Sequence, residues 1–268
     1  MQIAIRHKLS LALGSGIARS VQHVLLTPQT GPTQTVREWT IDMPGFERSA
    51  TFVDAFGNRA HLVSQTKPEA ELIISISGVV DTIDRNGVIG RRQGDIPPAL
   101  YKRPTALTKP IGAITSKFRA APKTGQDRIA LLHALMARVG EVVGSAEQSQ
   151  SQDGQMQSQT QAQTQAARPP ASDFAHAFIG AARSLEIPAR HVSGYLASDS
   201  DTPTLHAWAE AWDDGLGWIG FDPVLNLCPT DRHVRVAVGL DAVTTMAVRA
   251  VPVVGEPKVL SMTVEAAQ

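Results

Sequence analysis

The stretch from His206 to Pro223 reads HAWAEAWDDGLGWIGFDP and carries the clearest structural signal in the chain. Two aromatic-rich segments flank Asp-Asp-Gly-Leu-Gly, whose residue types favour a reversal of the backbone. A hairpin closed by these five residues sets Trp212 opposite Trp218. His206 then becomes a diagonal neighbour of Asp222 on the same sheet face, at about 7–8 Å between backbones. The stretch therefore predicts an imidazole–carboxylate pair on an antiparallel sheet.

Helical spacing marks the segments that precede this hairpin. Apolar residues recur over about four turns from Asp127, and a second apolar face runs from Phe174 to Leu185 after two consecutive prolines. A weaker pattern indicates a short helix after Thr108. Helices followed by antiparallel strands predict an α+β core over residues 105–268. The strands of this core are expected at 191–197, 205–212, 218–221 and 232–238, with one more near 260–264.

Residues 1–100 are predicted to form a separate β-rich domain. The apolar stretch 9–13 is too short for the roughly 7–15 residues of a secretory signal, so we expect a strand here instead of a targeting segment. No run approaches the roughly 18 apolar residues of a membrane span. Within this domain, strands are expected at 2–6, 36–41 and 72–79, a turn at 54–58 and an exposed connection at 81–98.

The composition is that of an ordinary globular protein, with 43% hydrophobic and 19% charged residues and a formal net charge of zero. Zero net charge argues against nucleic acid or an anionic membrane as a partner and leaves self-association open. Cys228 is the single cysteine, which excludes an internal disulfide and fits a reducing, cytoplasmic location. No cofactor is expected.

A glutamine-rich tract interrupts the predicted core. Glutamine alternates mainly with Ser, Thr, Ala and Met there, so the tract offers little apolar surface to offset its ordering entropy. We expect a disordered insertion at 147–168, with a polar binding or aggregation-prone segment as the alternative.

Five blocks in order carry a resemblance to a known family. They are Asp173–His176, Ile187–Tyr195, His206–Glu210, Gly217–Pro223 and His233–Gly239, and they resemble the bacterial transglutaminase-like family of the papain-type cysteine-enzyme superfamily. Segments 54–58 and 103–108 resemble its N-terminal β domain and connector. The resemblance implies a transglutaminase-like, papain-like fold: an α+β core of helices on an antiparallel sheet, behind a β-rich N-terminal domain.

The family motif at the nucleophile reads Gly-Val-Cys-Gln-Asp-Phe-Ala-His, and here the corresponding residues read PPASDFAH. This register places Ala171 where the family has its cysteine and Ser172 where it has glutamine. The resemblance assigns the general base to His206 and the orienting acid to Asp222. In such a triad a helix N-terminus and a neighbouring histidine stabilise the thiolate. The sequence thus predicts a triad reduced to Ala171, His206 and Asp222.

Other residues could supply chemistry at this site. Ser172 is expected to point away from His206 and to cap the following helix. Cys228 has no helix N-terminus to activate it and is expected to be an ordinary thiol. The spacing of the four histidines matches no zinc signature, and the tryptophans are expected to form a cross-strand cluster more readily than a substrate groove. These sets are His176, His191, His206 and His233, and Trp208, Trp212 and Trp218.

The main functional hypothesis is a degenerate transglutaminase-like protein that retains a peptide- or protein-binding cleft. His206 and Asp222 would then persist chiefly as a buried hydrogen-bonded pair. One alternative is an active amide hydrolase or acyltransferase with a relocated nucleophile, such as Ser172 or Cys228. Another is an interaction protein that uses the glutamine-rich tract for contact.

Overall fold

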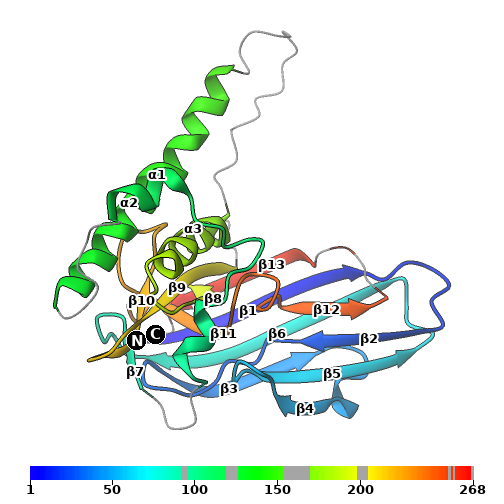
Figure 1. Cartoon of the computed structure of the whole chain (residues 1–268). Coiled ribbons are helices and arrows are strands. Elements are labelled where there is room, and N and C mark those ends of the chain that lie inside the picture. Colours follow the sequence, from blue (N-terminus) through cyan, green and yellow to red (C-terminus); the bar gives the residue numbers. More distant parts are fainter. Residues whose placement is uncertain are drawn as a thin grey trace.

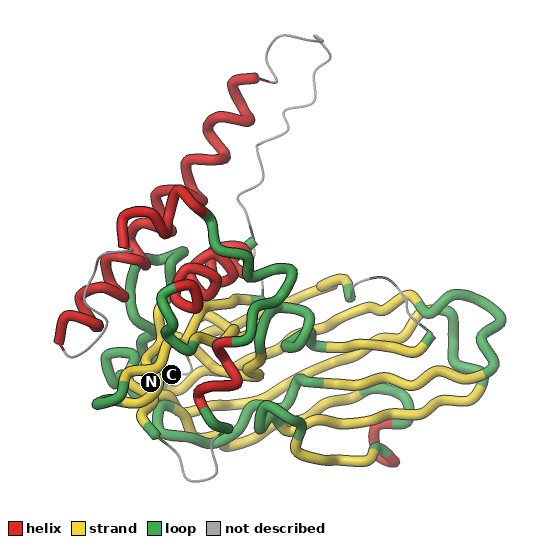
Figure 2. Tube along the Cα trace, viewed as in Figure 1, coloured by secondary structure: helices red, strands yellow, loops and turns green. Residues whose placement is uncertain are grey.

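The computed structural model describes residues 1–91, 96–118, 126–153, 170–197, 205–252, 255 and 257–266, apart from the side chains of residues 126–127 and 146–153. Strands form most of the regular secondary structure, and the α-helices gather at one end of the molecule (Figures 1 and 2). None of the helices in these ranges has the length and apolar character required to cross a membrane.

Two four-stranded antiparallel sheets contain the N-terminal strands, with orders β13-β1-β6-β3 and β12-β2-β5-β4. Residues of both sheets share one apolar cluster, in which Leu9 and Leu11 of one sheet meet Val24 and Val63 of the other. Period-two alternation turns these side chains inward. The predicted strands 2–6, 36–41 and 72–79 and the turn at 54–58 are confirmed. The strands are β1 Gln2–Ala12, β2 Arg19–Val24, β3 Gln34–Asp42, β4 Ala50–Val53, β5 Arg59–Thr66 and β6 Glu71–Thr82.

The end of the chain returns to these sheets. β12 (Val248–Val251) pairs with β2, and β13 (Lys258–Ala266) pairs with β1, where Ile3 faces Ala266. The two ends of the described chain therefore lie side by side (Figure 1). The division into residues 1–100 and 105–268 stays a prediction; the pairing adds the last two strands to the sheets built by the first six.

A five-stranded sheet with the order β11-β8-β9-β10-β7 forms the second part of the molecule. The predicted strands of the core are present, within one or two residues of their expected ends. The segment 81–98 is more than an exposed connection, because its three-residue strand β7 pairs with β10 at the sheet edge. So short a strand leaves no alternating pattern to read. The strands are β7 Val88–Gly90, β8 Ala189–Leu196, β9 His206–Asp213, β10 Gly217–Phe221 and β11 His233–Gly239.

Helix α3 packs on this sheet and α2 covers α3 (Figure 1). Phe174 and Phe178 of α3 share an apolar cluster with Ala209 and Ala211 of β9, whose small side chains let the helix lie close to the strand. The short helix expected after Thr108 is α1. The helices are α1 Gly112–Thr115, α2 Gln126–Asp153 and α3 Ala171–Ser184, with 3-10 turns at Phe46–Arg48, Pro98–Lys102 and Ser116–Phe118.

Helix α2 reaches Asp153 and so continues into the first residues of the glutamine-rich tract. Gln, Glu and Ser carry only modest helix penalties, which permits this extension. The remainder of the predicted insertion, residues 154–168, lies outside the described residues.

Candidate active site

The first turn of α3 presents Ala171 and Ser172. Pro170 occupies the N-cap position, no side chain caps the helix, and the amide of Asp173 donates to the Pro170 carbonyl at 2.9 Å. The prediction that Ser172 caps the helix is therefore wrong. A proline serves at this position because a helix start leaves its first N–H groups without intrahelical partners.

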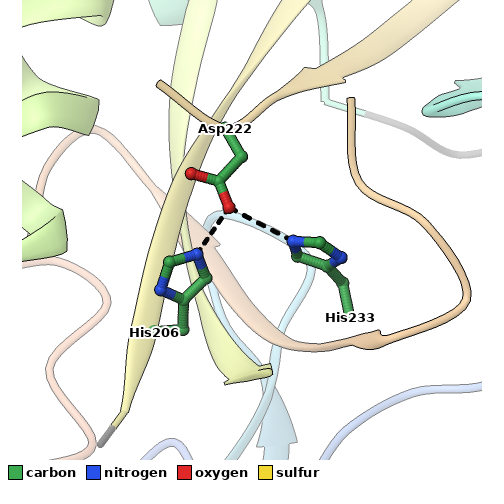
Figure 3. Close-up of side chains that lie close together, drawn as sticks. All are labelled: His206, Asp222 and His233. Carbon is green, nitrogen blue, oxygen red and sulfur yellow. Dashed lines mark hydrogen bonds and ion pairs between the residues drawn. The ribbon is translucent and has the colours of Figure 1, made fainter. Parts of the chain in front are cut away.

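The β9–β10 hairpin brings His206 and Asp222 together. Trp212 pairs with Trp218, as predicted, and the turn is held by Asp213, whose Oδ1 accepts the amides of Gly215 and Leu216 at 2.9 Å each. The Nε2 of His206 lies 2.6 Å from Oδ2 of Asp222 (Figure 3). The predicted imidazole–carboxylate pair is thus formed.

Asp222 is fully buried and its carboxylate is saturated with donors. Its Oδ1 accepts the backbone amides of Val224 and Leu225, at 3.0 and 3.3 Å, and its Oδ2 is shared by two histidines, His206 and His233. Burial would raise the pKa of Asp222, but hydrogen bonds and positive charge from both histidines outweigh it and lower the pKa to about 2. The carboxylate is therefore ionised and fixed in one orientation.

His233 is the site residue whose role sequence reasoning missed. It starts β11, and its Nε2 lies 3.2 Å from Oδ2 of Asp222 (Figure 3). The backbone amide of Thr230 donates to its Nδ1 at 3.1 Å. Because Nδ1 accepts, Nε2 must carry the hydrogen and donate it to Asp222. The sequence signals available were its place at the start of the family block 233–239 and its membership of the four-histidine set, and neither indicated a contact with Asp222.

A metal site is not supported by this arrangement. The ligand atoms of His206, Asp222 and His233 lie within 4.8 Å of one another, the one such group in the described part of the chain. A metal needs the lone pair of the histidine nitrogen, and His233 directs a hydrogen toward the group instead. The four-histidine site is not assembled either, because His176 stacks near His191, with ring centroids 5.1 Å apart, in a separate pair.

A cavity of about 340 Å³ extends from the start of α3 to His206. Ala171 and Ser172 line it together with His206, so the residues predicted to stand at the nucleophile and general-base positions border one space. Most of the wall is apolar and comes from both parts of the molecule. The remaining lining residues are Leu9, Leu25, Leu26, Pro170, His191, Ser193, Gly194, Tyr195, Leu205, Ala207, Val236, Ala242, Thr245, Met246, Ala247, Pro257 and Val259.

The two candidate replacement nucleophiles differ in position. Ser172 lines the same cavity as His206, and no hydrogen bond between their side chains is present in the described structure; the expectation that Ser172 points away from His206 stays a prediction. Cys228 does not line the cavity, and burial, followed by the negative charge of Asp84, raises the pKa of its thiol. Cys228 is therefore an unactivated thiol, as predicted from its place in the sequence.

The tryptophans stabilise the sheet and do not line the cavity. Trp212 and Trp218 meet edge to face across the hairpin, with ring centroids 5.4 Å apart. Trp208 stands apart from this pair and contacts His233, at 5.3 Å between ring centroids, and His206, at 6.1 Å. It thereby packs against both histidines that bind Asp222.

Comparison with known families agrees with this architecture. A family model of the transglutaminase-like superfamily matches residues 116–223, and a model of the bacterial transglutaminase-like N-terminal region matches residues 3–81. The chain belongs to the transglutaminase-like superfamily. The matched core contains Ala171, His206 and Asp222, and the β-rich N-terminal region precedes it, as the family resemblance implied.

Relatives of this transglutaminase-like protein extend over nearly its whole length. An uncharacterized protein of Mycobacterium leprae is 23% identical over 261 residues, which cover 90% of this chain and 89% of the relative. A crystal structure of a provisionally assigned cysteine protease from Cytophaga hutchinsonii superposes with a TM-score of 0.60 at 23% identity. That alignment covers 100% of this chain and 90% of the other, and it shows a shared fold.

Proposed function

We propose that this transglutaminase-like protein is catalytically degenerate and uses its cavity to bind a ligand. The single observation that carries the proposal is the methyl side chain of Ala171 at the start of α3, on the cavity that His206 also lines. His206 and Asp222, to which the family resemblance assigns the roles of base and orienting acid, lie 2.6 Å apart, and the side chain of Ala171 has no attacking atom.

The absence of a sulfur atom at Ala171 favours a binding function over catalysis. Cysteine enzymes of this kind attack an amide carbonyl with a thiolate, and an alanine methyl has neither a lone pair nor an acidic proton. Removing the nucleophile of a comparable triad reduces kcat on the order of 10⁶-fold. The resemblance suggests a peptide or protein ligand, and the single cysteine fits a cytoplasmic setting. The apolar wall of the cavity favours a smaller occupant.

Restoring the sulfur tests the proposal. The unmodified protein should show no amide hydrolysis or transamidation above background with a panel of peptide amides. Ala171→Cys should gain turnover, and the double variant Ala171→Cys with His206→Ala should lose it again. Turnover by the unmodified protein that disappears on His206→Ala would overturn the proposal.

A second candidate function is supported by the position of Ser172. Because Ser172 shares the cavity with His206, a serine hydrolase built on the same base is geometrically open. A fluorophosphonate probe separates the two candidates. Labelling of the unmodified protein that is lost in Ser172→Ala and in His206→Ala supports the serine nucleophile, and absence of labelling supports the binding role.

A further inference from the structure

The cavity wall is built chiefly from aliphatic side chains. Leu9 and Leu25 come from the N-terminal sheets, Val236 from β11, Met246 from the loop after β11 and Val259 from β13. β1 and β13, which supply Leu9 and Val259, lie at opposite ends of the sequence and pair only in the folded chain. Such a wall stabilises an apolar ligand by removing its surface from water.

Most polar groups of the wall already have partners inside the protein. The Ser193 hydroxyl donates to the Thr245 carbonyl at 3.2 Å, and the Thr245 hydroxyl lies 2.9 Å from Nδ1 of His191. The hydroxyl of Tyr195 lies 3.1 Å from Nδ1 of His7. A peptide segment in this cavity would bring backbone N–H and C=O groups that find few partners, which weakens its binding.

The part of the wall where His206 lies near the first turn of α3 differs, because it has hydrogen-bonding groups without partners in the described structure. His206 is 8% exposed, Asp222 holds its Nε2, and its Nδ1 has no hydrogen-bond partner among the described residues. Helix α3 begins on the same cavity, and its first turn has no side-chain cap. The N-terminus of this 14-residue helix favours an anion. Asp173 in the same turn is exposed and does not line the cavity.

The start of α3 and His206 surround the position where the family has a cysteine thiolate, an anion that Ala171 cannot supply. A thiolate at this position would receive the helix N-terminus on one side and an imidazolium on the other. The methyl group leaves the helix N-terminus without this anion, whereas His206 keeps the Asp222 carboxylate at 2.6 Å. A ligand carboxylate can take the place of the thiolate, because it accepts hydrogen bonds from backbone amides of the first turn and from Nδ1 of His206 when that nitrogen carries a hydrogen.

We propose that the cavity binds an aliphatic carboxylate. Its carboxylate lies between His206 and the first turn of α3, in the place of the missing thiolate, and its tail lies among the leucine, valine and methionine side chains of the wall. This inference rests on the proposed binding function and names the chemical class of the ligand. The same head group occurs on a fatty acid and on the C-terminus of an apolar peptide, and the wall favours the fatty acid.

Calorimetric titration of the full chain tests the proposal with defined probes. Octanoate should bind saturably with one site per chain. Octanamide, which keeps the tail and loses the charge, should bind at least about tenfold more weakly, as expected for loss of a charge-assisted hydrogen bond. Acetate, which keeps the charge and loses the tail, should show no saturation. N-acetyl-alanyl-leucine should bind more weakly than octanoate.

Two matched variants place the carboxylate. Ala171→Asp supplies a fixed carboxylate at the proposed position and should abolish octanoate binding. Ser184→Asp adds the same charge at the exposed far end of α3, outside the cavity, and should leave octanoate binding unchanged. The comparison of octanoate with octanamide needs no variant and keeps the test decisive even if Ala171→Asp fails to fold.

The outcomes separate this inference from the proposed function. Equal binding of octanoate and octanamide, retention of octanoate binding in Ala171→Asp, tighter binding of the dipeptide, or no binding of octanoate would each overturn the carboxylate assignment. None of these results bears on amide hydrolysis, which is assayed separately and decides whether the site is degenerate.

Discussion

His233 donates its Nε2 hydrogen to Oδ2 of Asp222 across 3.2 Å, so the carboxylate that orients His206 is itself held by a second histidine. Thr230 fixes the tautomer that makes this possible. His233 is therefore a positioning residue for the pair, acting through Asp222 and not on a ligand directly.

We expect His233→Ala to destabilise the fold by about 1–3 kcal/mol, because a buried acceptor loses a donor. The pKa of Asp222 is lowered to about 2 from an ordinary value of 3.8, so it contributes stability above pH 4 that is lost as the pH falls through 2. Losing His233 raises this pKa and reduces that contribution. Urea unfolding of both proteins from pH 2 to 7 measures it. His233→Gln, which can still donate, should recover part of the loss; equal losses in the two variants would contradict the donor role.

His7 gives the protein a second pH dependence, at milder acidity. Burial lowers its pKa to about 4 from an ordinary value of 6.5, and its Nε2 is buried without a partner in the described structure. As the pH falls below 6.5 the unfolded chain takes up a proton that the folded chain refuses, so stability should decline by about 3 kcal/mol down to pH 4. His191, whose pKa burial lowers to about 3, acts in the same direction.

His7→Phe should flatten this decline. Guanidinium unfolding at pH 4, 5, 6 and 8 gives the slope, and the value at pH 8, where His7 is neutral in both states, isolates the packing effect of the substitution. An unchanged slope between pH 6 and 4 would show that other groups dominate the acid response.

Arg183 connects four separate segments and should be a strong determinant of stability. It is 6% exposed, and we expect Arg183→Lys to lower the free energy of unfolding by about 3 kcal/mol or more, because several buried acceptors lose their donors together. Chemical denaturation measures the loss. The guanidinium donates at 2.8–2.9 Å to the carbonyls of Tyr101, Ala189 and Leu240 and to the hydroxyl of Thr108.

Arg138→Lys provides the control, since Arg138 is partly exposed, pairs with the exposed Glu141 and makes only long contacts, 3.3–3.4 Å, with the Ala113 carbonyl. Exposed ion pairs contribute about 1 kcal/mol or less. Comparable losses for the two arginines would disprove the structural role assigned to Arg183.

Gly194 faces His206 in the β8–β9 pairing and has no room for a side chain. A Cβ at this position would lie 2.7 Å from the Trp208 ring and would also meet the Val234 carbonyl. We expect Gly194→Ala to destabilise by about 1–3 kcal/mol and to disturb octanoate binding, because the strand that carries His206 must shift. Thermal unfolding and calorimetry measure the two effects.

Gly112→Ala is the control for this substitution. Nothing lies within 4 Å of a Cβ built at Gly112, which is in helix α1. Alanine there should be neutral or stabilise by roughly 0.5–1 kcal/mol. Equal thermal stabilities of Gly194→Ala and Gly112→Ala would show that the close packing around Gly194 does not contribute to the stability of the fold.

Local patterns in the sequence were sufficient to predict most elements and the central pair. The turn residues between Trp212 and Trp218 set the hairpin register, and a register on one sheet determines which side chains share a face. His206 and Asp222 could therefore be paired from spacing alone, and alternation in the first strands predicted the N-terminal sheets. The residue at the nucleophile position, Ala171, could be read directly from the family motif.

Only the tertiary structure revealed the contacts that depend on long-range packing. His233 meets Asp222 because β11 lies in the same sheet as β9, two places away from it, and nothing in the local pattern of β11 indicates that. The last two strands join the N-terminal sheets, and leucines near residues 9 and 25 form the wall of a cavity that begins at Ala171. Periodicity reports which face of an element is apolar, but which elements those faces meet is decided by how all the sheets and helices pack together.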